Sequence, residues 1–161
     1  MVAIQHRTRK TSRARRRGIA CRSEPTPLPA EKKGARLIVR SSPDIVQARQ
    51  LARELATEMG FSGSDVTRIA SAISEIARNI LDYAREGEIA FQSLPQGRGL
   101  QITARDHGPG IPDVSLAMQY GYSSGNGLGV GLPGARWLMD EFNIQSAPGK
   151  GTVVTMTKWL A

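Results

Sequence analysis

The stretch "EIAFQSLPQGRGLQITARD" (88–106) decides the fold class. Two strand-like runs, 88–94 and 99–106, flank the turn-forming segment "PQGRG". Strands joined by so short a connection pair antiparallel. The same arrangement recurs in "FNIQSA" (142–147) and "GTVVTMTKWL" (151–160), which the turn "PGKG" separates. The chain therefore predicts two antiparallel hairpins and excludes a doubly wound parallel sheet.

Two amphipathic helices precede the first hairpin. A strand over 35–40 leads into the first helix, which opens at Ser42 in "SSPD" and ends at Gly60. The second helix has Ser64 as its predicted N-cap and Gly87 as its end. Its apolar stripe consists of Ile69, Ile73, Ile76 and Ile80. We expect this stripe to face the sheet.

A third helix spans about 130–141, so that the order of elements is β, α, α, β, β, loop, α, β, β. This order predicts an α/β fold, namely a two-layer α/β sandwich. The sheet is expected to be mixed but mostly antiparallel, with the helices on one face. Residues 35–161 are expected to form one domain.

Residues 1–34 have a different composition from the rest of the chain. They hold ten Lys/Arg and two Glu and so carry the whole formal net charge of +8, whereas residues 35–161 hold twelve basic and twelve acidic residues. With few large apolar side chains, this segment is predicted to be a disordered basic tail. An arm for nucleic acid or a membrane surface is one interpretation. We favour a solvated extension or an unused upstream start, because no aromatic residue interleaves the arginines.

Cysteine content and hydropathy indicate the compartment. Cys21 is the single cysteine, so no intramolecular disulfide can form, which agrees with a reducing environment. No apolar run has the length needed to span a bilayer. The sequence therefore predicts a cytoplasmic protein without membrane insertion.

"GVGLPG" (129–134) has the glycine spacing of the dinucleotide fingerprint. That fingerprint requires a strand running directly into its first glycine, whereas the preceding residues, "YGYSSGNGL", are turn formers. Glycines at every second position, just before a helix, instead suit a loop whose N–H groups close on phosphate oxygens. The alternative is a flexible surface loop without a ligand. We favour phosphate binding, because long loops in compact domains are usually functional.

Four separated motifs resemble one superfamily. "SEIARN" (74–79), "DHGPGIPD" (106–113) and "GNGLGVGLPGAR" (125–136) resemble the N, G1 and G2 boxes of the GHKL ATPases, which have the Bergerat fold. "KGTVV" (150–154) is similar to the final Gly-Thr box of that superfamily. Over 35–161 the chain resembles the RsbT-type serine/threonine kinases, the switch kinases of the bacterial stressosome. The basic tail lies outside this resemblance.

The resemblance implies an ATP site with Mg²⁺. Asn79 would offer its amide oxygen to Mg²⁺, and Glu75, one helical turn earlier, could accept the proton of a partner's hydroxyl as the catalytic base. The alternative is a Glu and an Asn on a solvated helix flank. The nucleotide-binding residues implied are Asn79, Asp106, Gly108, Gly110, Ile111, Gly125, Gly127, Leu128, Gly129, Val130, Gly131 and Thr152.

The adenine end of this site is expected around Asp106. By resemblance its carboxylate accepts a hydrogen bond from the adenine amino group, and Thr152 supports it through water. The alternative for Asp106 is a turn residue bonded to its own backbone. His107 is interpreted as a surface turn residue, and Arg78 is not assigned to the γ-phosphate. The stretch 114–126, which contains two tyrosines (Tyr120 and Tyr122), is predicted to be a lid over the nucleotide or else an ordinary long loop.

The function implied is a Mg-ATP-dependent protein kinase acting on a serine or threonine of STAS-domain stressosome proteins of the RsbS and RsbR kind. Once released, such a kinase would activate a PP2C-type phosphatase in a partner-switching cascade that controls a sigma factor. One alternative is an anti-sigma factor kinase that sequesters its sigma factor directly. Others are a nucleotide-gated binding module without kinase activity, and a tether to nucleic acid or acidic lipid through the basic tail.

Overall fold

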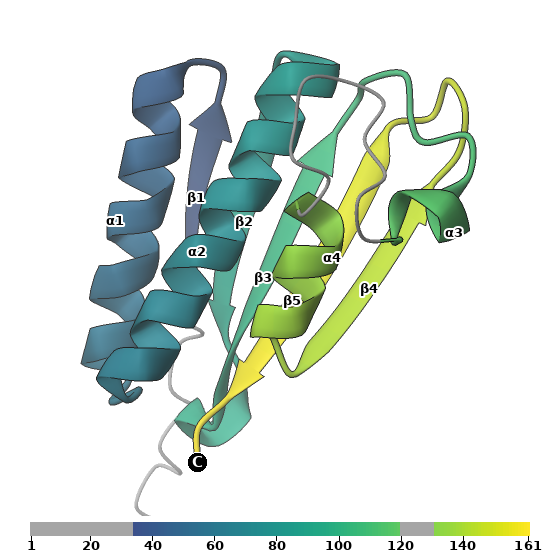
Figure 1. The fold of residues 1–161 in the computed structure, drawn as a ribbon. Coiled ribbons are helices and arrows are strands. Elements are labelled where there is room, and N and C mark those ends of the chain that lie inside the picture. The colour runs from purple at the N-terminus through teal and green to yellow at the C-terminus, as the bar shows by residue number, and fades with distance from the viewer. Residues whose placement is uncertain (1–33, 120–130) are drawn as a thin grey trace, which may run out of the picture. The chain divides into compact units, whose positions relative to one another are not determined.

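The computed structural model describes residues 34–119 and 131–161. Five strands form one sheet in the order β1-β2-β3-β5-β4 (Figure 1). The strands are β1 (Gly34–Val39), β2 (Gly87–Ser93), β3 (Gly99–Asp106), β4 (Glu141–Ser146) and β5 (Thr152–Trp159). All four neighbouring pairs are antiparallel. Both predicted hairpins, β2/β3 and β4/β5, are present. The sheet was expected to be mixed, but its five strands are all antiparallel to their neighbours, because β5 lies between β3 and β4 and runs opposite to both.

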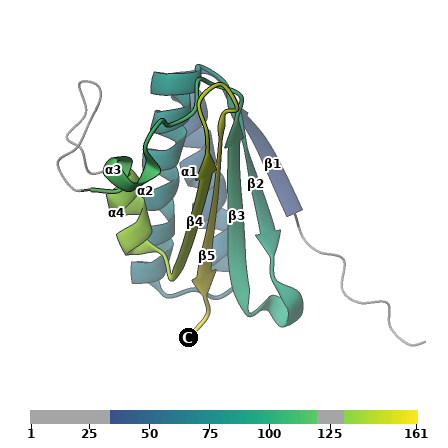
Figure 2. The same cartoon turned by 90° about the vertical axis from the view of Figure 1, so that its right-hand side faces the viewer.

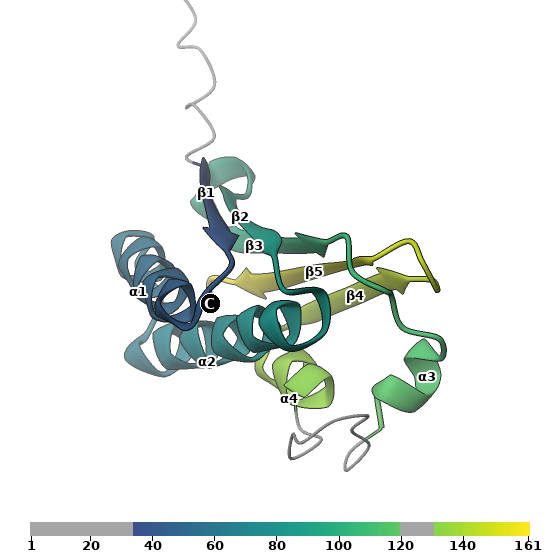
Figure 3. The same cartoon turned by 90° about the horizontal axis from the view of Figure 1, so that it is seen from above.

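The helices α1, α2 and α4 lie against one face of this sheet, and α3 lies on the same side (Figures 2 and 3). The α-helices are α1 (Ser42–Glu58), α2 (Gly63–Asn79), α3 (Val114–Ala117) and α4 (Gly131–Leu138). A π-helix η1 (Ile80–Ala84) follows α2 directly, and a 3₁₀ turn η2 (Pro95–Gly97) forms the connection between β2 and β3. Within the described residues no helix covers the opposite face. The predicted two-layer α/β sandwich is therefore confirmed.

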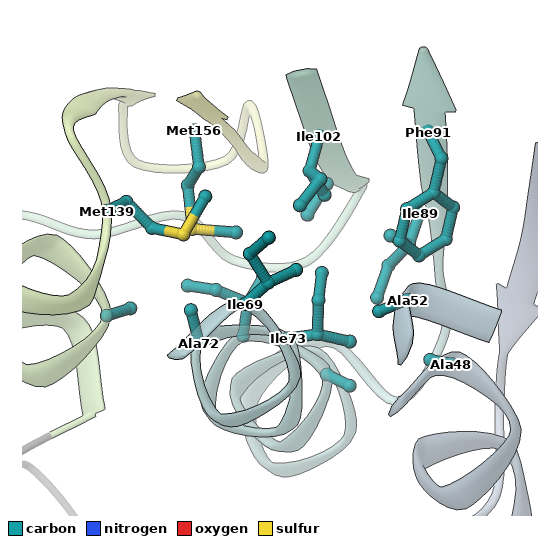
Figure 4. Close-up of a cluster of buried hydrophobic side chains, with 14 of the residues drawn as sticks. Ala48, Ala52, Ile69, Ala72, Ile73, Ile89, Phe91, Ile102, Met139 and Met156 are labelled. Carbon is teal, nitrogen blue, oxygen red and sulfur yellow. The ribbon is translucent and has the colours of Figure 1, made fainter. Parts of the chain in front are cut away.

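The core lies between α2 and the sheet. The predicted stripe of four isoleucines on the second helix is buried, each residue at most 3% exposed. Ile69 and Ile73 point from α2 toward the sheet residues Ile102 and Met156, while alanines of α1 pack at the side of Phe91 (Figure 4). Small residues on α1, including Ala48 and Ala52, allow the two helices to pack closely. This packing fixes α2, and with it the polar flank of α2, relative to the sheet.

Helix ends differ from the prediction by one to a few residues. The N-caps are Ser41 and Ser62, where Ser42 and Ser64 were predicted. Ser62 Oγ accepts a hydrogen bond from the Asp65 amide at 3.2 Å, which satisfies a free donor of the first turn. The second helix ends through the π-helix at Arg85, whose φ is 69°. Gly87 is therefore the first residue of β2 rather than a helix terminator.

None of the helices within residues 34–119 and 131–161 has the length and apolarity that crossing a membrane requires. The predicted basic tail, apart from Gly34 at the start of β1, lies outside the described residues.

Candidate functional site

One row of paired residues crosses the sheet at the end where β3 and β4 finish and β5 starts. From one edge to the other the row is Val39, Gly87, Asp106, Thr152 and Ser146. By strand alternation, its residues face the same side as the buried Ala104 and Val154, which is the side of the helices. The polar side chains of Asp106, Thr152 and Ser146 thus lie at this end of the apolar core.

Ser146 joins three segments of the chain through its hydroxyl. Its Oγ accepts a hydrogen bond from the Ile111 amide at 2.8 Å and donates to the Gly151 carbonyl at 2.9 Å. The same oxygen lies 2.8 Å from Thr152 Oγ1. These bonds attach the loop after β3 to the β4/β5 hairpin. Ile111 and Thr152, predicted from separate motifs, therefore meet at a residue that was not predicted.

Asp106 begins the loop with a hydrogen bond of its own. The Gly108 amide donates to Asp106 Oδ1 at 2.9 Å, which is the turn geometry named above as the alternative role of this carboxylate. A Cβ on Gly108 would come within 2.6 Å of the Ala84 Cβ, so the loop runs directly against η1. Glycine is required there because the two backbones approach closely.

Two further glycines hold the loop against the β4/β5 hairpin. Gly110 has a φ of 73°, and a Cβ there would collide with the Ala147 carbonyl oxygen. Gly151, at a φ of 72°, would collide in the same way with the Asp106 carbonyl oxygen. The Gly149 amide donates to the Pro109 carbonyl at 2.7 Å. Loop and hairpin thus form one closely packed unit.

Glu75 and Asn79 lie together on the flank of α2, both half-buried. Gly131, at the start of the described part of α4, faces them. A Cβ on Gly131 would stand 3.3 Å from Asn79 Oδ1 and 3.6 Å from Glu75 Oε2. The structure therefore brings Gly131 beside two predicted residues that precede it in the sequence by more than fifty positions. Arg78, which was not assigned to the γ-phosphate, is exposed.

The π-helix η1 connects the two groups of residues. It follows Asn79 directly, and its last residue, Ala84, packs against Gly108. Ile80, its first residue, would meet a Cβ placed on Gly87 at 2.8 Å. π-Helical turns occur frequently at functional sites. Here the turn lies between the Glu75 and Asn79 flank and the Asp106 loop.

Several predicted residues lie outside the described part of the chain: Gly125, Gly127, Leu128, Gly129, Val130, Tyr120 and Tyr122. Of the predicted lid, the short helix α3 is described, capped by Asp113 Oδ1, which accepts from the Leu116 amide at 3.0 Å. His107 is exposed. Among residues 34–119 and 131–161 there is no group of three or more His, Cys, Asp or Glu that could hold a metal ion.

Comparison with known proteins agrees with this architecture. The profile of the histidine kinase-like ATPase domain matches residues 40–158. The serine/threonine-protein kinase RsbT of Bacillus subtilis (strain 168) is 50% identical over 119 residues, which make up 73% of this chain and 90% of that protein. The chain belongs to the RsbT-type serine/threonine-protein kinases of the histidine kinase-like ATPase family. It is therefore a protein kinase of the partner-switching kind, and its domain implies the use of ATP.

More distant relatives bear other names. The anti-sigma F factor of Thermoanaerobacter sp. (strain X514) is 30% identical over 119 residues, covering 70% of this chain and 83% of that protein. A crystal structure of the RsbU and RsbW domains of Rv1364c from Mycobacterium tuberculosis superposes with a TM-score of 0.57 at 24% identity. The match covers 79% of this chain and 32% of that one, and it supports the fold alone.

Ser146 is the polar residue that the sequence motifs missed. A signal for it does exist in the sequence, because Phe142, Ile144 and Ser146 alternate along one face of β4. The turn "PGKG" then sets Ser146 opposite Thr152. Strand alternation and hairpin register together would have placed Ser146 beside a predicted binding residue.

Proposed function

We propose that this kinase transfers the γ-phosphate of Mg-ATP to a serine or threonine of a STAS-domain stressosome protein. After release from that partner it would activate a PP2C-type phosphatase in a partner-switching cascade. The observation that best supports this proposal is the 50% identity to a serine/threonine-protein kinase RsbT over 90% of that protein's length. The proposed setting is the cytoplasm.

The nucleotide would extend from the Asp106 loop, past η1, to the flank of α2 that carries Glu75 and Asn79. Asp106 and Thr152, paired across β3 and β5, would receive the adenine edge. Gly108 and Gly110 hold the loop after Asp106 closely against η1 and the β4/β5 hairpin, so the backbone of this loop would stand beside the base. The phosphates would extend toward Gly131, where the start of the described part of α4 faces Asn79. Helix N-termini attract phosphate through their free N–H groups.

A magnesium ion fits this donor set as a partner of the phosphates. Asn79 offers one neutral oxygen beside a glycine, and Mg²⁺ usually takes one or two protein oxygens and completes its coordination with water and phosphate. When bound, the ion would neutralise charge on the phosphates.

Glu75 is the proposed general base. Its carboxylate lies one helical turn before Asn79 and faces Gly131, so it would stand near the phosphate end of the nucleotide. It would accept the hydroxyl proton of the partner's serine or threonine while that oxygen bonds to the γ-phosphorus and ADP leaves. Half-burial would keep the carboxylate accessible to an incoming partner loop.

The test measures phosphate transfer from Mg-ATP to a co-encoded STAS-domain protein by intact mass. We expect a gain of one phosphate on the partner with the wild type. Glu75→Gln and Glu75→Ala should abolish transfer while retaining ATP binding, and Asn79→Ala should lose both. Glu58→Gln, an exposed glutamate at the end of α1, is the matched control and should transfer normally.

The outcomes separate the candidate functions. Absence of transfer by the wild type, with ATP bound tightly, would contradict the kinase proposal for that partner and favour a nucleotide-gated binding module. The similarity to an anti-sigma F factor supports a second candidate, direct sequestration of a sigma factor. Nucleotide-dependent capture of a purified sigma factor by the wild type would favour that candidate.

A further inference from the structure

We propose that a basic rim beside the Asp106 loop docks an acidic surface of the protein substrate. The basic rim consists of Arg85, Arg105 and Lys150, whose side chains are all exposed. This inference rests on the proposed function, because it takes the partner to be the protein that receives phosphate at the Glu75 end of the site. It adds a second contact at the other end of η1, which would set how tightly that partner binds.

Three connections at one end of the sheet carry the basic rim. Arg85 follows η1 directly, Arg105 is the second-last residue of β3, and Lys150 lies in the turn between β4 and β5. At this end β2 starts, β3 ends and β5 starts, and it forms the top of the sheet in Figure 1. The three cations therefore gather around the loop that follows Asp106.

The loop after β3 touches both of the other connections. Gly108 lies against η1, since a Cβ there would come within 2.6 Å of the Ala84 Cβ. On the other side, a Cβ on Gly151 would stand 3.0 Å from the Cα of His107, which is exposed. Ala84 and Gly151 are each the chain neighbour of one cation of the basic rim. The rim is therefore continuous across three segments of the chain.

The cations of the basic rim have few carboxylates to neutralise them. Within the part of the chain that the structure describes, none of the three forms an ion pair. Glu88 is paired with Arg105 in the β2/β3 register, but its carboxylate binds Arg36 at 3.3 Å. Glu86 is exposed and offsets part of the charge. The rim thus keeps a net positive charge, which suits carboxylates on the surface of a partner.

The backbone of Arg85 supports a use for its side chain. Its φ is 69°, in the left-handed region where any side chain costs free energy relative to glycine. Helices commonly end with glycine in this conformation. An arginine there carries a cost that a purely structural terminator avoids, and such costs concentrate at functional sites. We therefore expect the exposed guanidinium to bind a group on another molecule.

The proposed reaction favours a protein as that molecule. A protein partner must place its hydroxyl beside Glu75, and a stable protein interface involves about 20–30 residues on each side. The five residues of η1 are all that separates Asn79 from Arg85 along the chain. A partner of ordinary interface size would therefore reach both Glu75 and the basic rim. Carboxylates on that partner would meet the cations and speed its association.

The experiment measures steady-state phosphate transfer to the co-encoded STAS-domain protein at varied partner concentration and saturating Mg-ATP. Arg85→Gly and Lys150→Gln should each raise the KM for the partner about threefold, and the double variant about tenfold. The kcat and the KM for ATP should not change, because the lost contact binds the partner alone. Added salt should raise the KM of the wild type more than that of the double variant.

Two matched controls lie at the opposite end of the sheet. Arg98→Gln removes an exposed arginine at the end of η2. Gln96→Gly relieves a left-handed residue, with a φ of 62°, without removing a charge. Both should keep the wild-type KM for the partner. The melting temperature of Arg85→Gly should not fall, because glycine adopts the left-handed conformation without strain, and unfolding then cannot explain its weaker binding.

The outcomes distinguish this inference from the kinase proposal. An unchanged KM and salt dependence in the double variant would overturn the inference and leave the kinase proposal intact. An equal rise in KM for Arg98→Gln would also overturn it, because the effect would then follow net charge rather than the rim. Binding of polyuridylic acid that only the double variant loses, with its KM for the partner unchanged, would assign the rim to nucleic acid instead. Absence of transfer by the wild type would overturn both proposals.

Discussion

Lys158 Nζ lies 2.7 Å from Asp140 Oδ1, and the lysine side chain is only 9% exposed. The same ammonium lies 3.6 Å from a carboxylate oxygen of Asp65, in the first turn of α2. Asp140 also accepts a hydrogen bond from the Trp159 amide at 2.8 Å. This cluster attaches the end of β5 to α2 and to the connection between α4 and β4. It lies at the opposite end of the sheet from the candidate site.

The first prediction concerns the pH dependence of stability. Partial burial alone would raise the pKa of Asp140, but the hydrogen bonds from Lys158 and the Trp159 amide outweigh it and lower the pKa below 3.8. A carboxyl with a lowered folded pKa contributes stability that is complete above its unfolded pKa and is lost as the pH falls through the folded value. Stability should therefore fall below about pH 4, and Asp140→Asn should reduce that dependence.

At neutral pH, Asp140→Asn should lower the free energy of unfolding by about 1–2 kcal/mol. The cost is moderate because Asp65 remains beside the lysine and Asp140 is itself partly exposed. Urea unfolding at neutral and acidic pH measures both effects. Asp82→Asn, an exposed aspartate in η1, is the control and should follow the wild type. Equal acid sensitivity of Asp140→Asn and the wild type would contradict the assignment.

The sequence predicts the sheet well because its signals are local. Alternation along 99–106 and the turn residues before it define a strand and its antiparallel partner without reference to the rest of the chain. The isoleucine stripe of α2 is equally local. By contrast, the spacing of apolar residues does not predict the π-helical turn after Asn79. Ile80 continues the buried isoleucine stripe of α2, as it would if the α-helix simply went on.

The sequence predicts the candidate site less completely, because its residues come from separate segments that only the tertiary structure brings together. Motifs identify Ile111 and Thr152 separately, but only the pairing of β4 with β5 brings Ser146 between them. The closeness of Gly131 to Asn79 depends in the same way on how α4 packs against α2. The hydroxyl of Ser146 has three hydrogen-bonding partners, Ile111, Gly151 and Thr152, and no single segment of the sequence contains all of them.

The second prediction compares two glycines with the same backbone conformation. Gly110 and Gly149 both have a φ of 73°, so alanine at either position incurs a similar strain of about 1 kcal/mol. Only at Gly110 would the new Cβ collide with a carbonyl oxygen, that of Ala147, whereas the space around Gly149 is open. Gly110→Ala should therefore destabilise the fold clearly more than Gly149→Ala and also weaken ATP binding. Thermal unfolding and ATP titration measure the two effects, and equal behaviour of the variants would refute the close packing.

The third prediction separates the two roles of Asp106. An asparagine can still accept the hydrogen bond from the Gly108 amide, which the structure shows at 2.9 Å, so Asp106→Asn should preserve the turn and the melting temperature. Its amide removes the negative charge and adds donors, so ATP affinity should fall at least about tenfold. Asp106→Ala should lose both the turn and the affinity. If Asp106→Asn bound ATP as tightly as the wild type, Asp106 would have only the turn role.

The fourth prediction concerns Gly131 and the phosphate end of the site. A Cβ there would stand 3.3 Å from Asn79 Oδ1. Because that atom ends a flexible side chain, the expected response to Gly131→Ala is a shift of the Asn79 amide rather than unfolding. Mg-ATP affinity should then fall about three- to tenfold while the affinity for adenosine, which lacks phosphates, stays unchanged.

Calorimetric titration of both ligands into Gly131→Ala measures this difference. Gly63→Ala, at the start of α2 with open space around it, is the matched control and should bind both ligands as the wild type does. A parallel loss of adenosine and Mg-ATP affinity would mean that the substitution also disturbs the adenine end of the candidate site. Unchanged Mg-ATP affinity would contradict the proposed role of Asn79 at the phosphates. The new methyl group must displace the Asn79 amide, and a displaced amide could not hold Mg-ATP in the same geometry.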